Sequence, residues 1–238
     1  MKIFDTSKTR FSNTDLKKEI ILPEKLTFEL AEETGLHIGD GSMNFYLHNR
    51  SYKGIYSLRG HILDDKKHYN LRIKNLYLKL YNFKPSLRSM KSTGVYGFQI
   101  WTDCVVDFKH KILGLPLGYK TNVRIPDCFL NNKKYYPDII RGIFDTDGCV
   151  YLEHRNKRLY PRIQVGTISA ILAEQMRKIL LYLGFRVTKF MENRVNKGWS
   201  NFYVISVRGD DMFKKWMEII KPANPKHIKK FNFYINNS

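Results

Sequence analysis

Thr34-Gly35-Leu36-His37-Ile38-Gly39-Asp40-Gly41-Ser42 is the stretch around which this chain is organised, and a similar stretch returns as Arg141-Gly142-Ile143-Phe144-Asp145-Thr146-Asp147-Gly148-Cys149. Each copy holds two small residues four positions apart, Gly35/Gly39 and Gly142/Thr146. Residues four apart lie on one face of a helix, and small ones there let a second helix approach closely. Each copy ends in Asp-Gly, where the glycine suits the left-handed conformation that closes a helix. We therefore predict two apolar helices that pack against each other through their small residues.

The aspartates that end the two copies, Asp40 and Asp147, are placed unfavourably for stability. A carboxylate at a helix C-terminus faces the negative end of the helix dipole. Two such helices in contact would also bring the carboxylates close enough to repel each other. Bound divalent cations would remove both penalties, because hard ions such as magnesium take carboxylate and carbonyl ligands. For one copy alone, Asp-Gly is equally well read as a turn signal; two copies in matching surroundings favour the metal site.

The segments 35–41 and 142–148 resemble the motif of the LAGLIDADG homing endonucleases, in the single-chain form that carries two motif copies. The resemblance implies that Asp40 and Asp147 are the metal-binding catalytic carboxylates, helped by the backbone carbonyls of Gly39 and Thr146. It implies Mg²⁺ as the cofactor, with Mn²⁺ substituting and Ca²⁺ binding without supporting cleavage. The first copy departs from the family pattern at Ile38, where the family often has an acid. That position is not the catalytic one, so the departure does not argue against activity.

Charge points to a polyanionic partner. The 238 residues include 41 lysines and arginines against 22 aspartates and glutamates, a formal net charge of +19. Nucleic acid explains such an excess best. The alternatives are compositional bias and an anionic membrane surface, and the latter would call for a basic amphipathic helix, which does not stand out.

Cysteine usage and the N-terminal sequence bear on the compartment. Three widely spaced cysteines fit neither a zinc pattern nor a disulfide framework, which favours a reducing compartment. No run approaches the length of a membrane span, and residues 1–5 do not begin a signal peptide. We expect an intracellular protein, cytoplasmic in a prokaryote or organellar in a eukaryote.

The chain reads as a duplication. We expect helices at residues 27–40, 64–81, 103–113, 138–147, 171–183 and 210–220, and strands at 43–48, 53–61, 87–92, 96–102, 149–154, 162–167, 185–191 and 202–207. Segment 98–100 aligns with 203–205, and Phe108 with Phe213, at one constant offset of 105. We expect an N-terminal half with a lead-in segment (1–113), a linker (114–136) and a C-terminal half (137–238).

The predicted fold is therefore α+β, a pseudo-two-fold duplication of an αββαββα unit with the motif helices at the interface. Two antiparallel four-stranded sheets would form a DNA-binding saddle along the major groove, which admits β-ribbons. Local two-fold symmetry of duplex DNA would place one carboxylate near each strand.

Basic and amide side chains in or between the strands are the candidate DNA contacts. Taken singly, each is a better candidate for a phosphate contact or a solvated charge than for a base reader. They are Arg50, Lys53, Arg59, Arg88, Lys91, Arg155, Arg158, Arg162, Gln164, Lys189 and Arg194. Strand alternation groups Ser57 with Arg59 and His61, and Arg162 with Gln164, but aligning Gly60 with Gly166 does not keep these faces in phase.

The ends of the second strands differ from the family, many members of which have a lysine there near the scissile phosphate. The corresponding positions here are Gly60-His61 and Gly166-Thr167-Ile168. His61 is a candidate catalytic residue in the first half. The alternative is that it is structural or simply exposed.

We expect a site-specific double-strand DNA endonuclease, a homing enzyme encoded in an intron, acting as a monomer on a long pseudo-palindromic or asymmetric target. Metal ions would activate water and stabilise the leaving oxygen. The alternatives are an RNA maturase that assists splicing of its intron, with intron RNA as partner, and a non-cleaving DNA-binding protein of the same fold. The presence of both Asp40 and Asp147 favours cleavage, since a pure binder has no need of carboxylates that face phosphates.

Overall fold

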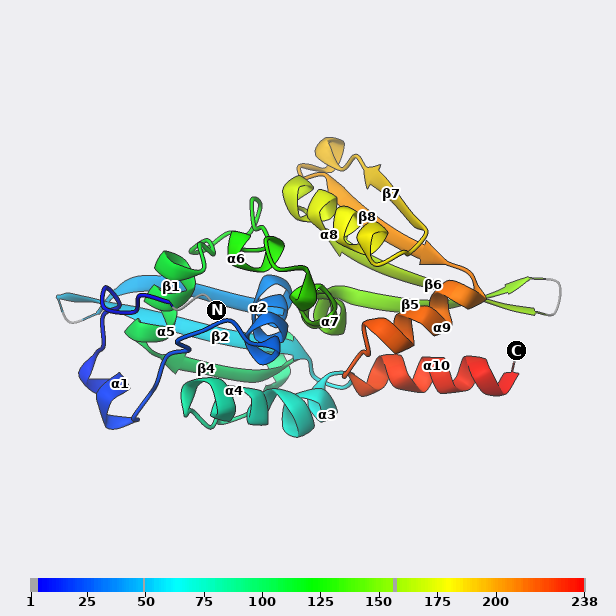
Figure 1. The fold of residues 1–238 in the computed structure, drawn as a ribbon. Helices are drawn as coiled ribbons and strands as arrows, with labels where there is room; N and C mark the ends of the chain where they lie inside the picture. The colour runs from blue at the N-terminus through cyan, green and yellow to red at the C-terminus, as the bar shows by residue number, and fades with distance from the viewer. Residues whose placement is uncertain (1–3, 49, 156–157, 238) are drawn as a thin grey trace.

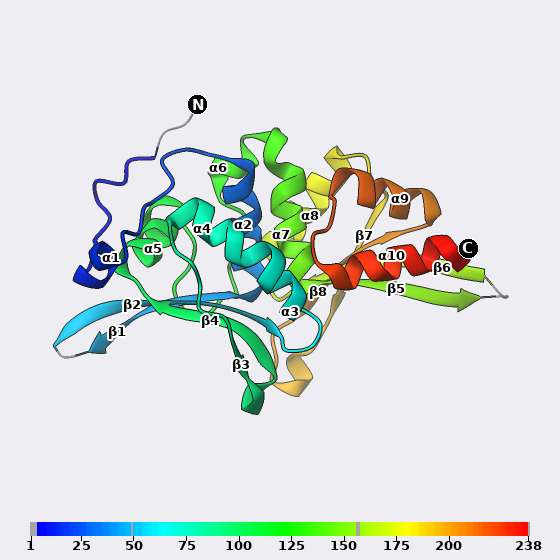
Figure 2. The same cartoon turned by 90° about the horizontal axis from the view of Figure 1, so that it is seen from below.

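The computed structural model describes residues 4–48, 50–155 and 158–237. It consists of two halves, each with a four-stranded antiparallel sheet, on either side of a central pair of helices, α2 and α7 (Figure 1). The strand orders are β1-β2-β4-β3 and β5-β6-β8-β7, so the two sheets have the same topology. Figure 2 shows the sheets extending in opposite directions along one side of the molecule, with the helices on the other side. The predicted fold class is confirmed.

The first half follows the predicted order. Its elements are α1 (Asn13–Lys17), α2 (Phe28–Asp40), β1 (Gly41–His48), β2 (Ser51–His61), α3 (Lys66–His68), the π-helical turn η1 (Tyr69–Ile73), α4 (Lys74–Tyr81), β3 (Arg88–Met90), the 3₁₀ turn η2 (Lys91–Thr93), β4 (Val95–Trp101), α5 (Asp103–Asp107) and the π-helical turn η3 (Phe108–Ile112). Thr102 caps α5, because its hydroxyl accepts a hydrogen bond from Val105 N.

The second half repeats this order after a structured connection. Its elements are α6 (Asp127–Leu130), the 3₁₀ turn η4 (Lys133–Tyr135), α7 (Tyr136–Asp147), β5 (Gly148–Arg155), β6 (Arg158–Thr167), α8 (Ala170–Tyr182), β7 (Val187–Glu192), the 3₁₀ turn η5 (Val195–Lys197), β8 (Phe202–Arg208), α9 (Asp210–Ile219) and α10 (Pro225–Asn237). Pro137 lies in the first turn of α7, where proline is tolerated. Helix α10 was not predicted from the sequence. The domain boundaries at 113 and 136 stay a prediction.

Helices α2 and α7 touch backbone to backbone at Gly35 and Gly142. A Cβ atom on Gly35 would overlap the carbonyl oxygen of Ile139 and lie 2.9 Å from the Cα of Gly142. One on Gly142 would overlap the carbonyl of Glu32 and lie 2.7 Å from the nitrogen of Leu36. Any other residue at either position would therefore hold the helices apart, as the spacing of small residues predicted.

The glycines after the two aspartates do not act as left-handed caps, so that prediction is wrong. Gly41 and Gly148 have φ angles of −73° and −85° and are extended, because each opens a strand directly at the end of its helix. Their lack of a side chain serves close packing instead. A Cβ on Gly41 would lie 2.6 Å from the carbonyl oxygen of His37, and one on Gly148 would overlap the Phe144 ring.

Strand register corrects the internal alignment. Gly41 pairs with Leu58 and Gly148 with Val165, while Leu58 also pairs with Phe98 and Val165 with Ile205. One offset of 107 relates all three positions, so the predicted offset of 105 is wrong by two residues. A shift of two keeps the alternation of faces, which is why it was not visible in the pattern.

The same offset matches Ser57 to Gln164 and Arg59 to Gly166, and this removes the phase conflict between the halves. Ser57 pairs with Gln99, and Gln164 with Ser206, on the face of each sheet that the helices do not cover. We call the two uncovered faces together the open face.

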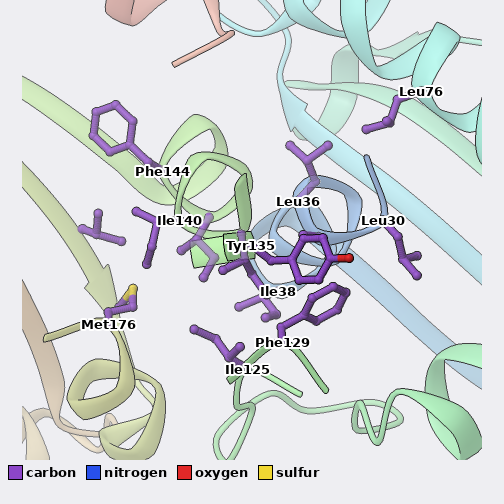
Figure 3. Close-up of a cluster of buried hydrophobic side chains, with 14 of the residues drawn as sticks. Leu30, Leu36, Ile38, Leu76, Ile125, Phe129, Tyr135, Ile140, Phe144 and Met176 are labelled. Carbon is purple, nitrogen blue, oxygen red and sulfur yellow. The ribbon is translucent and has the colours of Figure 1, made fainter. Parts of the chain in front are cut away.

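The core lies between the sheets and the helices and continues through the α2–α7 pair. Figure 3 shows Leu36 and Ile38 of α2 and Ile140 and Phe144 of α7 in one cluster, with Met176 of α8 beside it. The two halves therefore share a core. Among the described residues, no helix is long and apolar enough to cross a membrane.

We predict that Gly142→Ala lowers the free energy of unfolding by roughly 1–3 kcal/mol, because the new methyl group meets backbone that cannot move away. Urea denaturation measures this change. Gly39→Ala is the matched comparison, because its Cβ would meet the Thr146 side chain, 2.6 Å from the Thr146 Cβ. Adding Thr146→Gly should recover part of the Gly39→Ala loss in a double-mutant cycle, whereas no side-chain change should rescue Gly142→Ala. Wild-type stability of Gly142→Ala would contradict the backbone contact.

Candidate active site

Asp40 and Asp147 lie at the C-terminal ends of α2 and α7, where β1 and β5 begin. The close approach of the helices brings the two carboxylates together at the junction of the two sheets. A Cβ on Gly39 would lie only 3.4 Å from the Asp147 carboxyl carbon. Asp40 is half-buried, and Asp147 opens onto solvent.

The surroundings disfavour the charged form of both carboxylates. Burial, together with the charges of Asp147 and Asp65, raises the pKa of Asp40 from 3.8 to about 7, although Lys226 and Lys120 act to lower it. Although Asp147 opens onto solvent, partial desolvation by the surrounding protein raises its pKa to about 6, against the effect of the same two lysines. Water reaches Asp147 and screens its charge, so the larger energetic effect is at Asp40.

Lys120 contacts the end of α2. Its ammonium donates hydrogen bonds to the carbonyl oxygens of Ile38, at 2.9 Å, and of Gly39. Burial lowers the pKa of Lys120, while Asp147 and Asp40 raise it. The lysine comes from the connection between η3 and α6, outside both sheets.

A polar network connects Asp65 to the segment before α10. Asp65 accepts hydrogen bonds from His61 N at 2.7 Å and Asn224 Nδ2 at 2.7 Å, and forms an ion pair with Lys226 Nζ at 2.9 Å. Asp65 faces Asp40 across Gly60, since a Cβ on that glycine would lie 2.7 Å from one carboxylate and 3.0 Å from the other.

Asp145 holds the same segment from the second half. Its carboxylate accepts hydrogen bonds from the backbone nitrogens of Ala223, at 2.9 Å, and Asn224, at 3.2 Å. Ile38 is the counterpart of Asp145 in the first motif copy and is buried among apolar side chains. At Ile38 the first half therefore has a core residue instead of this acid, and lacks the hydrogen bonds that Asp145 makes.

A pocket of about 400 Å³ opens beside Asp147. Gly39, Lys120, Asp147 and Gln164 line it on the polar side, and Phe202 closes it on another. The pocket places the carboxylate, a helix-end carbonyl and an ammonium group around one solvent-accessible space. Such an arrangement can hold a phosphate group together with a cation.

The carboxylate pair fits a magnesium site of the kind that works on phosphates. Within residues 4–48, 50–155 and 158–237, no group of three or more His, Cys, Asp or Glu side chains is arranged to hold a metal. Mg²⁺ usually binds one or two carboxylates and completes its shell with water and substrate phosphate oxygens. Asp40, Asp147 and the helix-end carbonyls of Gly39 and Thr146 match that donor set.

Most predicted DNA contacts lie on or beside the open face. Register places six of them there, namely Lys53, Arg59, Arg88, Arg158, Arg162 and Gln164. Arg194 stacks 4.1 Å from the ring of Phe202, which is also on that face. Arg50 and Lys91 lie in exposed turns at the ends of strands. Arg155 is opposite Arg158 in the strand register, and its side chain lies outside the described part of the chain.

Lys189 is misplaced in that list. It is opposite Ile205, a core residue, so it points to the face that the helices cover. There it forms an ion pair with Glu174 of α8 at 2.7 Å. The strand β7 was expected at 185–191 but runs from Val187 to Glu192. Nothing in the local sequence indicates which face of the sheet Lys189 occupies.

His61 ends β2 on the open face, and its imidazole is about half exposed. Its Nδ1 lies 3.1 Å from Asp64, and its backbone nitrogen binds Asp65. A catalytic role for His61 stays a prediction. Four residues near the carboxylates were not predicted from the sequence: Lys120, Lys226, Asp65 and Asn224. The spacing of Lys120 and Lys226, which is nearly one repeat length, could have indicated that the two lysines occupy matching places.

Comparisons with known proteins agree with the fold. The family model for the LAGLIDADG-like domain matches residues 136–221. The homing endonuclease I-DmoI in complex with DNA and Ca has 17% sequence identity and a TM-score of 0.61, over 86% of this chain and 97% of that one. The LAGLIDADG homing endonuclease I-GzeII in complex with its DNA target has 11% identity and a TM-score of 0.54, over 89% of each chain. At these identities the structures establish the shared fold.

A curated relative matches part of the chain. The NrdEB subunit alpha of ribonucleoside-diphosphate reductase from Bacillus subtilis (strain 168) is 27% identical over 130 residues, which is 49% of this chain and 12% of that protein. The chain thus spans about an eighth of the length of this relative. The resemblance to the LAGLIDADG family, inferred from the two motif copies, is confirmed by the domain match and the fold.

We predict that Asp40→Asn stabilises the metal-free protein. The pKa of Asp40 is higher in the folded state than the ordinary 3.8, so the ionised carboxylate destabilises the fold increasingly as the pH rises from about 4 to about 7. In EDTA the variant should gain roughly 1–4 kcal/mol at pH 8 and less at pH 5. Asp147→Asn should gain less, because water screens that carboxylate.

Thermal unfolding at the two pH values measures the effect. Asp211→Asn, which removes an exposed carboxylate on α9, serves as the control and should show no comparable gain. If Asp40→Asn melts at a lower temperature than wild type at pH 8 in EDTA, the ionised Asp40 does not destabilise the metal-free fold and the prediction is wrong.

Proposed function

We propose that this protein, which has a LAGLIDADG-like domain at residues 136–221 and the fold of the two-motif LAGLIDADG endonucleases, is a site-specific endonuclease that cuts both strands of duplex DNA. The observation that carries the proposal is the position of Asp40 and Asp147. Both lie at the ends of the packed helices, at the centre of an open face that carries basic side chains on both sheets.

The two similar halves of the chain suit the two-fold symmetry of a DNA duplex. The two sheets extend in opposite directions from the carboxylate pair, so one half can follow the DNA on each side of the cleavage point (Figure 2). The net charge of +19 supplies attraction to the phosphate backbone. One chain holds both motif copies and both carboxylates, which supports action as a monomer on a long target of limited symmetry.

We propose Mg²⁺ as the cofactor, with Mn²⁺ as a substitute and Ca²⁺ as a ligand that does not support cleavage. Asp40, Asp147 and the carbonyls of Gly39 and Thr146 would hold the ions. Bound divalent ions activate water and stabilise the leaving oxygen. The chain itself positions the duplex on the open face and holds two carboxylates that are poorly neutralised without a cation.

Two alternatives belong to other functional classes: an RNA maturase that binds its intron RNA, and a DNA-binding protein that does not cut. The pair of Asp40 and Asp147 at the ends of the packed helices argues against both, because a protein that only binds nucleic acid has no need of carboxylates that face phosphates. Selection of cleaved molecules from a library of duplexes, in Mg²⁺ and in EDTA, tests the proposal and identifies the target. Binding of intron RNA without any DNA cleavage would favour the maturase.

We predict that Asp40→Asn and Asp147→Asn each abolish double-strand cleavage of the selected duplex. An acid among phosphates helps binding only through its metal, so affinity for the duplex should stay within about tenfold of wild type, roughly 1.4 kcal/mol. Gel assays of cleavage and fluorescence anisotropy of binding measure the two properties. Asp211→Asn should cut like wild type, and undiminished cleavage by either motif variant would refute the assignment of the carboxylates.

We predict a steep salt dependence of DNA affinity. If about 6–10 phosphates are neutralised, affinity should fall by about 10³–10⁵-fold between 50 and 200 mM salt. Arg59→Ala removes an open-face charge and should reduce the salt slope by about one, whereas Lys189→Ala removes a charge on the helix-covered face and should leave the slope unchanged. Equal slopes for these two variants would mean that the open face is not the DNA-binding surface.

A further inference from the structure

The described strand ends beside the carboxylates offer no lysine or arginine. His61 ends β2, and its imidazole is directed to Asp64, 3.1 Å away. The offset of 107 makes Ile168 its counterpart in the second half, following Thr167 at the end of β6. If this site cuts DNA as proposed above, these two strand-end positions do not supply a lysine or arginine to stabilise charge on the scissile phosphate.

Lys120 reaches the site from the connection between the halves. Its ammonium binds the carbonyl oxygens of Ile38 and Gly39 and lies 3.4 Å from that of His37. It also lines the pocket that opens beside Asp147. One cationic group therefore lies at the end of the first motif helix and faces the space beside the second carboxylate.

The Gly39 carbonyl cannot hold an ammonium and a divalent ion side by side without repulsion between the two cations. A metal ion bound to that oxygen would displace Lys120 from it. The flexible four-carbon stem of the lysine allows this movement, and the pocket provides the space to which the ammonium can turn.

Lys226 has the matching place in the second half. It follows α9, as Lys120 follows the third helix of the first half, and the two are separated by 106 residues, one less than the offset between the sheets. Lys226 is held differently, because its ammonium pairs with Asp65 at 2.9 Å. Asp65 neutralises it locally, and Asn224 and Asp145 fix the segment that carries it.

We propose that Lys120 is a catalytic residue that contacts the scissile phosphate from the pocket beside Asp147, and that Lys226 is a positioning residue that keeps Asp65 neutralised next to Asp40. The duplicated chain thus supplies its active-site cations from the two segments that follow the third helices, and not from the strands. The alternative is that Lys120 only caps the carbonyls at the end of α2, as lysines near helix C-termini do.

Lys120→Gln separates the two roles, because the amide can still donate a hydrogen bond to a carbonyl but carries no charge. For a catalytic cation, we expect the single-turnover cleavage rate in saturating Mg²⁺ to fall by about 10²–10³-fold. We expect Ca²⁺ to bind about tenfold more tightly without DNA, because a competing charge is gone. The Ca²⁺-dependent shift in melting temperature measures that affinity.

Lys178→Met on α8 removes the same charge far from the carboxylates and should match wild type in both measurements. Lys120→Met replaces Lys120→Gln if the latter does not fold, as judged by its melting transition in EDTA. A wild-type cleavage rate, or unchanged or weaker Ca²⁺ binding, would overturn the catalytic role of Lys120. Failure of the wild-type protein to cut any selected duplex would instead refute the proposed function, so the two failures are distinguishable.

Discussion

The contact between Gly35 and Gly142 is the constraint on which the rest of the structure depends. Each glycine faces the backbone of the other helix, with no room for a Cβ atom. Because α2 and α7 end in Asp40 and Asp147 and continue directly into β1 and β5, their separation also fixes the separation of the carboxylates and of the two sheets. One helix contact thus determines both the chemistry at the centre and the shape of the open face.

This contact brings Asp40 and Asp147 close together, and nearby lysines offset the resulting repulsion only in part. Two carboxylates at the negative ends of two helices raise each other's energy, and burial raises the pKa of Asp40 to about 7. Lys120 and Lys226 lower the pKa of both aspartates, yet both pKa values stay above the ordinary 3.8. Stability alone would favour an amide or an apolar residue at these positions. A bound divalent cation would offset the remaining unfavourable free energy of the two ionised carboxylates.

The sequence was sufficient for features that repeat with a short period. The spacing of Gly35 and Gly39 predicted the helix contact. Strand alternation grouped Ser57 with Arg59 and Arg162 with Gln164, and the strand register agrees with both groups. It was insufficient where a position depends on tertiary contacts. An offset of 105 and one of 107 give the same alternation, so only the pairing of Leu58 with Phe98 and of Val165 with Ile205 decides between them. Lys189 was predicted to contact DNA because its local sequence does not show that its ammonium pairs with Glu174 on α8.

The departures from internal symmetry are as informative as the symmetry itself. At matched positions of the two motif helices, Ile38 packs in the core while Asp145 binds the backbone before α10. The acid therefore anchors the segment that carries Lys226, whereas Lys120 reaches the helix end from a connection that no such acid holds. Asp65 closes the Asp40 side, and the pocket leaves the Asp147 side open. Two halves built on one pattern thus give their two carboxylates two different environments.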